Sequence, residues 1–197
     1  MPISINGTGT ITGISAGGLP DDSITTAEIA GSAVTTAKLA QPLTLATAQA
    51  STSGTAIDFT GIPSWARRIT VMLEGVSTSG ASICQIQLGS TTFSTSGYLG
   101  VYSAWSNASS PVVVSISSGF GIFTDNAANV RHGSIQLNWV SANKWTCSGV
   151  ICFSSTAIQA TMAGSISLGG ILDRVRITTV NGTDTFDAGS INIMYEG

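Results

Sequence analysis

Apolar and polar residues alternate through most of residues 50–197, which is the spacing of strands that bury one face. The clearest run covers residues 68–76, and the same period of two recurs in several later segments. Clusters of Gly, Ser, Asn and Asp separate these segments, and Asn181-Gly182 predicts a hairpin. The pattern predicts a mainly β protein in which residues 50–197 form an antiparallel β-sandwich, jelly-roll-like. The alternating positions give the predicted core: Ile69, Val71, Leu73, Ile86, Leu88, Ile135, Leu137, Trp139, Ile177, Ile191 and Ile193.

A different pattern occupies residues 21–40, where the sequence of residues 23–30 returns in modified form at residues 33–40. Neither one continuous helix nor one strand would place the apolar positions of this repeat on a single face. A short helical turn in each copy, linked by extended residues, fits best. So thin a segment cannot bury its own apolar residues, so we expect them to pack against other copies of the chain in a homo-oligomer. These residues are Ile24, Ile29, Val34 and Leu39.

The two patterns divide the chain into three parts. Residues 1–20, rich in Gly and Thr, are predicted to form an N-terminal arm or tether. Residues 21–49 hold the decapeptide repeat, an extended oligomerisation segment, and a linker. Residues 50–197 form the sandwich head. The arm is either a frayed terminus or a strand that docks on a neighbour, and its residues leave both alternatives open.

Composition narrows the possible partners. Hydrophobic residues make up 43% of the chain and charged residues only 9%, well below the roughly 25% usual in soluble proteins. The net charge of −3 comes from few ionisable groups, so no basic face is available for phosphates, and we expect no nucleic-acid partner. Since no window approaches the ~18 apolar residues of a membrane span, no membrane insertion is expected either.

Candidate catalytic groups are few. The one histidine, His132, falls at a predicted turn, and we interpret it as an isolated surface residue rather than a general base. Among the carboxylates only Asp184 and Asp187 lie at a spacing that invites a catalytic pair, and stabilisation of a turn or a weak cation contact at an oligomer interface is the favoured interpretation. The sequence therefore predicts no enzyme, no cofactor and no metal site.

The three cysteines match no metal or redox spacing. We expect Cys84, Cys147 and Cys152 to be buried, reduced thiols that act as small apolar side chains. A bridge between Cys147 and Cys152 is the alternative.

Three stretches carry a resemblance to a known family. Residues 18–27 (Gly-Leu-Pro-Asp-Asp-Ser-Ile-Thr-Thr-Ala), 54–65 and 173–193 resemble segments of tail-fibre-like structural proteins of tailed phages and prophages. The resemblance implies a homotrimer with a repeat stalk and a β-sandwich head, assembled in the host cytoplasm and located in the virion. It implies a short tail fibre, or a tail or baseplate appendage, with a role in host attachment.

The same resemblance leaves other functions open. A capsid decoration (cement) protein is the alternative, whereas a glycan depolymerase would need a paired-carboxylate cleft or a long β-helix that the sequence does not show. The expected partners are other tail, baseplate or capsid proteins, bound through the N-terminal segment, and a glycan or protein of the host cell surface.

The best candidate for a host contact is residues 97–107, predicted as loops at one end of the head. Tyr98, Tyr102 and Trp105 offer flat apolar rings, and neighbouring hydroxyl and amide groups offer hydrogen bonds, which allows recognition without charge. The three rings do not share one parity, so a single core-facing strand would not bury them all. Packing in the core or between subunits is the alternative role.

Overall fold

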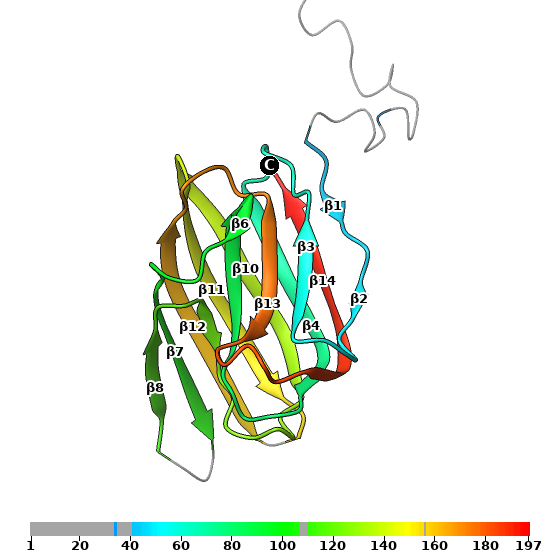
Figure 1. The fold of residues 1–197 in the computed structure, drawn as a ribbon, viewed down its shortest axis with the longest axis vertical. Coiled ribbons are helices and arrows are strands. Elements are labelled where there is room, and N and C mark those ends of the chain that lie inside the picture. Colours follow the sequence, from blue (N-terminus) through cyan, green and yellow to red (C-terminus); the bar gives the residue numbers. More distant parts are fainter. Residues whose placement is uncertain (1–33, 35–40, 107–109, 156) are drawn as a thin grey trace, which may run out of the picture. The chain divides into compact units, whose positions relative to one another are not determined.

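A computed structural model describes residue 34 and residues 41–106, 110–155 and 157–197. The chain divides into two units, residues 1–40 and 41–197, and all fourteen strands belong to the second. Every strand pair is antiparallel, and the described residues contain no helix, which confirms the predicted antiparallel β-sandwich (Figure 1). Of the four predicted oligomerisation residues, Ile24, Ile29 and Leu39 lie outside the described residues, and Val34 is exposed.

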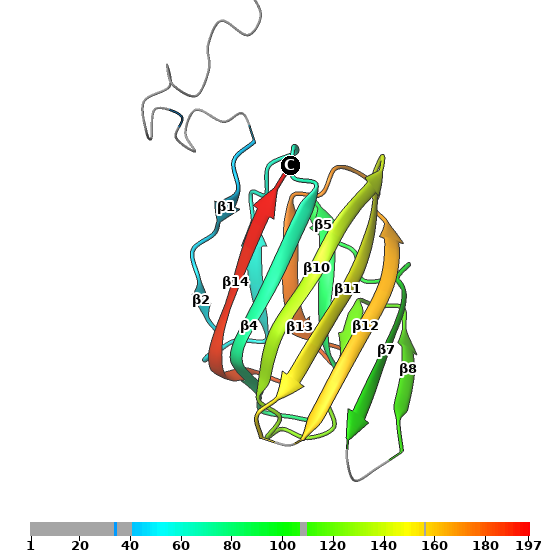
Figure 2. The same cartoon turned by 180° about the vertical axis from the view of Figure 1, so that it is seen from behind.

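The larger sheet has nine strands and forms one layer of the sandwich (Figure 2). Strands β10 to β12 follow one another as a meander, and β7 and β8 extend the sheet to its far edge. In spatial order the strands are β1 (Thr44–Leu45), β14 (Phe186–Glu196), β4 (Arg68–Thr78), β10 (Arg131–Ser141), β11 (Lys144–Phe153), β12 (Ile158–Ser167), β7 (Leu99–Ser106) and β8 (Val112–Ile116), with β2 (Gln49–Ala50) also paired to β14.

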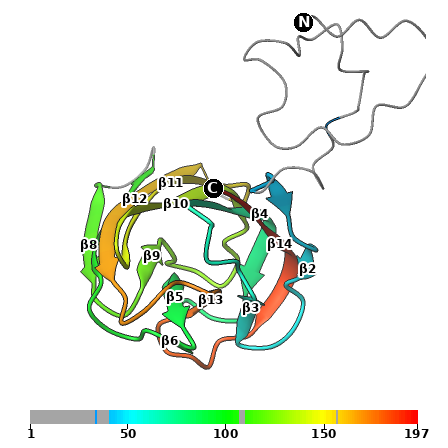
Figure 3. The same ribbon diagram turned by 90° about the horizontal axis from the view of Figure 1, so that it is seen from above.

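The smaller sheet has five strands, and the larger sheet curves around it (Figure 3). Its strands are β3 (Ala56–Thr60), β13 (Arg174–Thr179), β5 (Cys84–Ser90) and β6 (Thr92–Phe93), with β9 (Phe120–Ile122) paired to β5. Ile86 of β5 and Ile177 of β13 are buried cross-strand partners on the inner face of this sheet. The core therefore lies between the two sheets, as the period of two requires.

The predicted core residues are all buried except Trp139, whose side chain is 37% exposed. Trp139 has the inward parity of β10, but the strand register shifts between Trp139 and Ser141 next to the turn into β11. Its indole N–H donates to the Ala142 carbonyl at 2.6 Å, and the Arg67 guanidinium lies 4.6 Å from its ring centroid. The end of the strand thus carries this ring out of the core.

Two predicted connections are wrong. Residues 41–54, predicted as a linker, contain the strands at 44–45 (β1) and 49–50 (β2), because their backbone groups find partners along β14, including Ala46 N–H to Ile193 C=O at 2.9 Å. The Asn181-Gly182 turn forms, with Gly182 at a φ of 67°, but it joins strands of different sheets and is not a hairpin. The Asn181 side chain accepts hydrogen bonds from the N–H groups of residues 183 and 184, so the local turn signal was correct and the strand pairing was not.

The turn between β10 and β11 offers a test of backbone strain. Ala142 adopts a φ of 47°, which costs a residue with a Cβ about 1–2 kcal/mol. We expect Ala142→Gly to raise the free energy of unfolding by about 0.5–1 kcal/mol, because the relief exceeds the entropic cost of glycine. The control is Ala128→Gly, at an exposed turn residue outside the positive-φ positions, which should lower stability by about 0.4–1 kcal/mol. Urea unfolding measures both, and a loss of stability in Ala142→Gly would contradict the strain.

Candidate functional site

The stretch predicted as a receptor loop is a strand in the structure. Residues 99–106 form β7, which pairs with β12 on one side and β8 on the other, so its backbone groups are committed to the sheet. Alternation then separates the rings: Tyr98 and Tyr102 are 2% and 3% exposed, whereas Trp105 is 56% exposed. The prediction of loops is therefore wrong, and the prediction that the three rings would not be buried together is confirmed.

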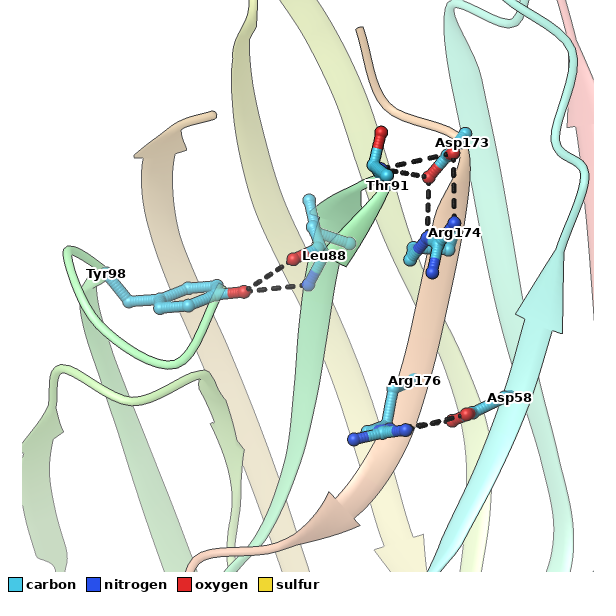
Figure 4. A network of polar contacts seen from close by, with 7 residues as sticks. All are labelled: Asp58, Leu88, Thr91, Tyr98, Asp173, Arg174 and Arg176. Carbon is cyan, nitrogen blue, oxygen red and sulfur yellow. Dashed lines mark hydrogen bonds and ion pairs between the residues drawn. The ribbon is translucent and has the colours of Figure 1, made fainter. Parts of the chain in front are cut away.

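Tyr98, just before β7 of the larger sheet, contacts β5 of the smaller sheet. Its hydroxyl accepts a hydrogen bond from the Leu88 N–H at 2.7 Å (Figure 4). The same hydroxyl lies 3.1 Å from the Ser94 carbonyl, to which it can donate. Its ring meets the Phe120 ring edge-on, with centroids 5.0 Å apart. Burial raises the pKa of Tyr98, so the phenol stays neutral. These contacts make Tyr98 a core residue and remove it from any exposed contact surface.

A cleft of about 420 Å³ opens beside Tyr102, where β7 ends and β8 and β12 begin. The opposite wall comes from residues 81–83, just before β5, and residues 123–125, just after β9. Trp105 stands at the rim, since it lines the cleft and is largely exposed. Most of the remaining lining is apolar: Ala81, Ile83, Ala104, Val112, Phe123 and Ile158. The structure therefore brings two of the three predicted rings to one cavity.

Among the described residues that line the cleft, polar groups are few and none carries a positive charge. Asp125 is exposed and makes no ion pair with any described residue, while Ser110 adds a hydroxyl. The Tyr102 hydroxyl makes no hydrogen bond to a described residue, and burial raises its pKa, so it remains a proton donor. The cleft thus suits an uncharged ligand with an apolar part and hydrogen-bonding groups, and it disfavours an anion.

A buried arginine fixes one wall of the cleft. The Arg131 guanidinium donates to the Thr124 hydroxyl at 2.7 Å and, more weakly, to the Asn129 and Val76 carbonyls at 3.4 Å. Its Nε has no acceptor, and no ion pair within the described residues involves this side chain. The Thr124 hydroxyl also accepts from the Cys84 N–H at 3.2 Å and donates to the Ile122 carbonyl at 3.3 Å, so it is saturated and holds the wall rather than a ligand.

The histidine is held in a tautomer that does not activate its serine neighbour. His132 lies on β10, half-buried, rather than at the predicted turn. Its Nδ1 accepts the Gly75 N–H at 3.2 Å, so a neutral ring carries its proton on Nε2. Nε2 lies 3.0 Å from the Ser154 hydroxyl, which it therefore faces as a donor. A base that takes the serine proton needs the opposite tautomer.

Of the two close carboxylates, Asp184 stabilises a turn, whereas Asp187, on β14, joins that strand to β4. Asp184 accepts the Ser82 N–H at 3.0 Å and the Asn181 side-chain amide at 2.7 Å. Asp187 accepts a hydrogen bond from the Ser77 hydroxyl. The two acids are therefore engaged with different segments, which agrees with the predicted structural role.

Other acids belong to ion pairs on the smaller sheet and its edge (Figure 4). Asp58 binds Arg176 with two contacts of 2.7 Å, and Asp173 binds Arg174 at 2.7 Å. The Arg174 contact holds the pKa of Asp173 below its usual value. Among the described residues, no three His, Cys, Asp or Glu side chains gather as a metal site would require.

The cysteines differ from the prediction in one respect. Cys84 and Cys147 are buried and free, and burial raises the pKa of Cys147 to about 12, so this thiol stays protonated. Cys152 is exposed rather than buried. A bridge between Cys147 and Cys152 is excluded because both lie on β11 at positions of opposite parity and therefore point to opposite faces.

Sequence reasoning missed Ile83, Phe123 and Asp125, which complete the cleft with Tyr102 and Trp105. The apolar run that ends at Phe123 and the turn signal Asp125-Asn126 indicate only the end of a strand. No local sequence pattern links these residues to β7.

Comparisons with family models, curated proteins and solved structures find no match. No helix with the length and apolar character to cross a membrane occurs in the described part of the chain.

The two buried tyrosines form a matched pair for a stability test. Tyr98→Phe should lower the free energy of unfolding by about 1–3 kcal/mol, because the buried Leu88 N–H loses its acceptor. Tyr102→Phe should cost about 0.5 kcal/mol or less, because this hydroxyl faces the cleft without a described partner. Urea unfolding of both variants gives the comparison, and equal losses would contradict the assignment of Tyr98 as the bracing residue.

Proposed function

We propose that this chain is a non-enzymatic structural protein of a tailed-phage virion, most simply a short tail fibre or a tail or baseplate appendage whose head contacts the host surface. The observation that carries the proposal is the aromatic and apolar cleft at one end of a β-sandwich. A cleft of this kind recognises its ligand through shape, ring faces and a few hydrogen bonds. The family resemblance of residues 18–27, 54–65 and 173–193 supports the same assignment.

The chemistry of the head favours binding over catalysis. The histidine faces its serine as a donor, Asp184 holds a turn, and Asp187 binds Ser77 of the neighbouring strand. A glycosidase needs one carboxylic acid and one carboxylate across the scissile bond, and Asp125 is the one carboxylate among the described residues that line the cleft. A ligand bound there would meet rings and hydroxyl groups without a second acid to complete the reaction.

Trimer formation through the repeat is part of the proposal. The apolar residues at positions 24, 29, 34 and 39 recur every five residues, and a segment so thin gains burial only from other copies. Three heads on one stalk would present three clefts together. Capsid decoration is the alternative location, and it requires docking on the particle but no ligand cleft.

The location is tested by immunogold labelling of phage particles with antibody against the head. We expect gold at the tail tip, fibres or baseplate. Label spread over the capsid would establish the decoration role instead, and particles without label would contradict a virion component of either kind.

Host contact is tested with the full-length protein and cultured host cells. Trp105→Ala should weaken binding to the cells at least tenfold, because it removes the ring at the rim of the cleft, while the melting temperature stays within a few degrees. Trp139→Ala is the matched control, since Trp139 is also partly exposed and lies near the turn between β10 and β11, at the end of the sandwich opposite that at which β7 ends (Figure 2). Unchanged binding by Trp105→Ala, or an equal loss in both variants, would remove the cleft as the contact site.

A further inference from the structure

Over the middle of five neighbouring strands, the outer face of the larger sheet carries no charged side chain, and Lys144, at the start of β11, borders this region. We define the uncharged face as every second residue of 134–138 on β10, 146–152 on β11, 159–165 on β12, 99–103 on β7 and 113–115 on β8. The strand register joins these positions in rows, one of which runs from Gln136 through Ser148, Ala163 and Val101 to Ser115. The face is therefore continuous across the strands.

Large apolar side chains protrude from this face. Leu99 is 76% exposed and Val113 is 68% exposed, and Val101 and Val150 are each about half exposed. Ser, Thr, Ala, Gln and Asn fill most of the remaining positions. An exposed apolar group of this size, set among neutral polar residues, is typical of a protein contact surface rather than of a surface that faces only water.

The face is also shaped to receive side chains. A shallow hollow of about 400 Å³ lies over β10, β11 and β12, and its lining includes Gln136, Ser148, Val150 and Thr161. The hollow is open to the outside and belongs to the outer side of the sheet, so it is separate from the cleft on the inner side of β7.

The area suits a contact between two folded chains. Strands about 4.8 Å apart and outward residues about 6.8 Å apart along a strand give each outward residue about 33 Å², or about 530 Å² for the whole face. The protruding side chains raise the accessible area above this flat footprint. A standard interface takes about 800 Å² from each partner, so the uncharged face supplies most of one.

We infer that the uncharged face packs against another copy of this chain in the assembled protein. Each copy has a net charge of only −3, so salt screens most of the repulsion between copies, and a face without charge brings no like charges together on contact. In a symmetric oligomer the same patch can meet itself. The uncharged polar groups and exposed valines of this face can do so without placing like charges opposite each other. This interface lies in the head and goes beyond the proposed function, which places oligomerisation in the repeat.

Cys152 provides a native probe, because it is an outward residue of the uncharged face and is exposed in the single chain. Cys84 and Cys147 are buried and serve as internal controls. The experiment measures alkylation of Cys152 by N-ethylmaleimide in the full-length protein at micromolar concentration, by mass spectrometry. The reference is the same chain unfolded in guanidinium chloride, and light scattering gives the mass of the assembly.

We expect Cys152 to react at least tenfold more slowly in the native protein than in the unfolded reference. Val150→Arg should restore fast alkylation, because a charge in the covered face opens it. Val180→Arg, at a valine of similar exposure in the turn after β13, should leave the slow rate unchanged. Ser148→Glu is the second variant on the face, used with circular dichroism to confirm folding if Val150→Arg fails to fold.

Fast alkylation in the native protein would overturn the inference. If light scattering also gives an oligomeric mass, the copies assemble through the repeat alone. If it gives a monomeric mass, the proposed homo-oligomer is contradicted as well. Slow alkylation in a monomer, or slow alkylation that neither Val150→Arg nor Ser148→Glu changes, would show that something other than a second copy protects Cys152 and would also overturn the inference.

Discussion

Each inward apolar side chain of a two-layer β protein needs cover from the opposite sheet, and here nine strands face five. In the middle of the sandwich, the opposite sheet covers the inward side chains completely, as the buried Val71, Leu88 and Ile177 show. At the β8 edge, the opposite sheet does not reach the inward side chains. Val112 has the inward parity of its strand but is 38% exposed, and the cleft opens beside it. The candidate binding site is thus a consequence of the unequal widths of the two sheets.

The period of two was enough to predict the sheets but not their edges. Ile69, Val71 and Leu73 alternate without interruption, so strand β4 and its buried face followed directly from the sequence. In β7 the signal was weaker, because the buried positions Gly100 and Ala104 are small and the outward positions Leu99 and Val101 are apolar. A strand whose two faces are similar in polarity does not show which face is buried.

The cleft could not be predicted from the sequence, because no local pattern shows which distant segments meet. It combines the segments around Ile83, Tyr102 and Phe123, which meet only because β5, β7 and β9 belong to two facing sheets. Asn181-Gly182 shows the same limit, since turn chemistry fixes the bend but not the sheet in which the next strand pairs. Arg131 also gave no signal, because burial of a guanidinium depends on distant acceptors such as the Val76 carbonyl.

The buried guanidinium explains why the wall of the cleft keeps its shape. A charge removed from water is costly unless polar groups surround it, so the conformation that offers Arg131 the Thr124 hydroxyl and the Asn129 carbonyl is favoured over alternatives. The Asn129 side chain in turn accepts the N–H groups of Asp125 and Asn126, at 3.1 and 3.2 Å. The segment that ends the smaller sheet is thereby held from both sides, and a preorganised wall loses little entropy when a ligand binds.

Strand β7 contributes to both the cleft and the uncharged face. Tyr102 and Ala104 face inward and line the cleft, while Leu99, Val101 and Ser103 face outward on the uncharged face. Contact between copies on the outer side of β7 would restrain the same backbone whose inner side shapes the cleft. Copies joined in this way would also hold their clefts at fixed separations, so that one bound cleft raises the effective concentration of ligand at the next. Weak, uncharged recognition at each cleft would then suffice for firm attachment of the assembly, which is the form of binding that a chain with so few charges can achieve.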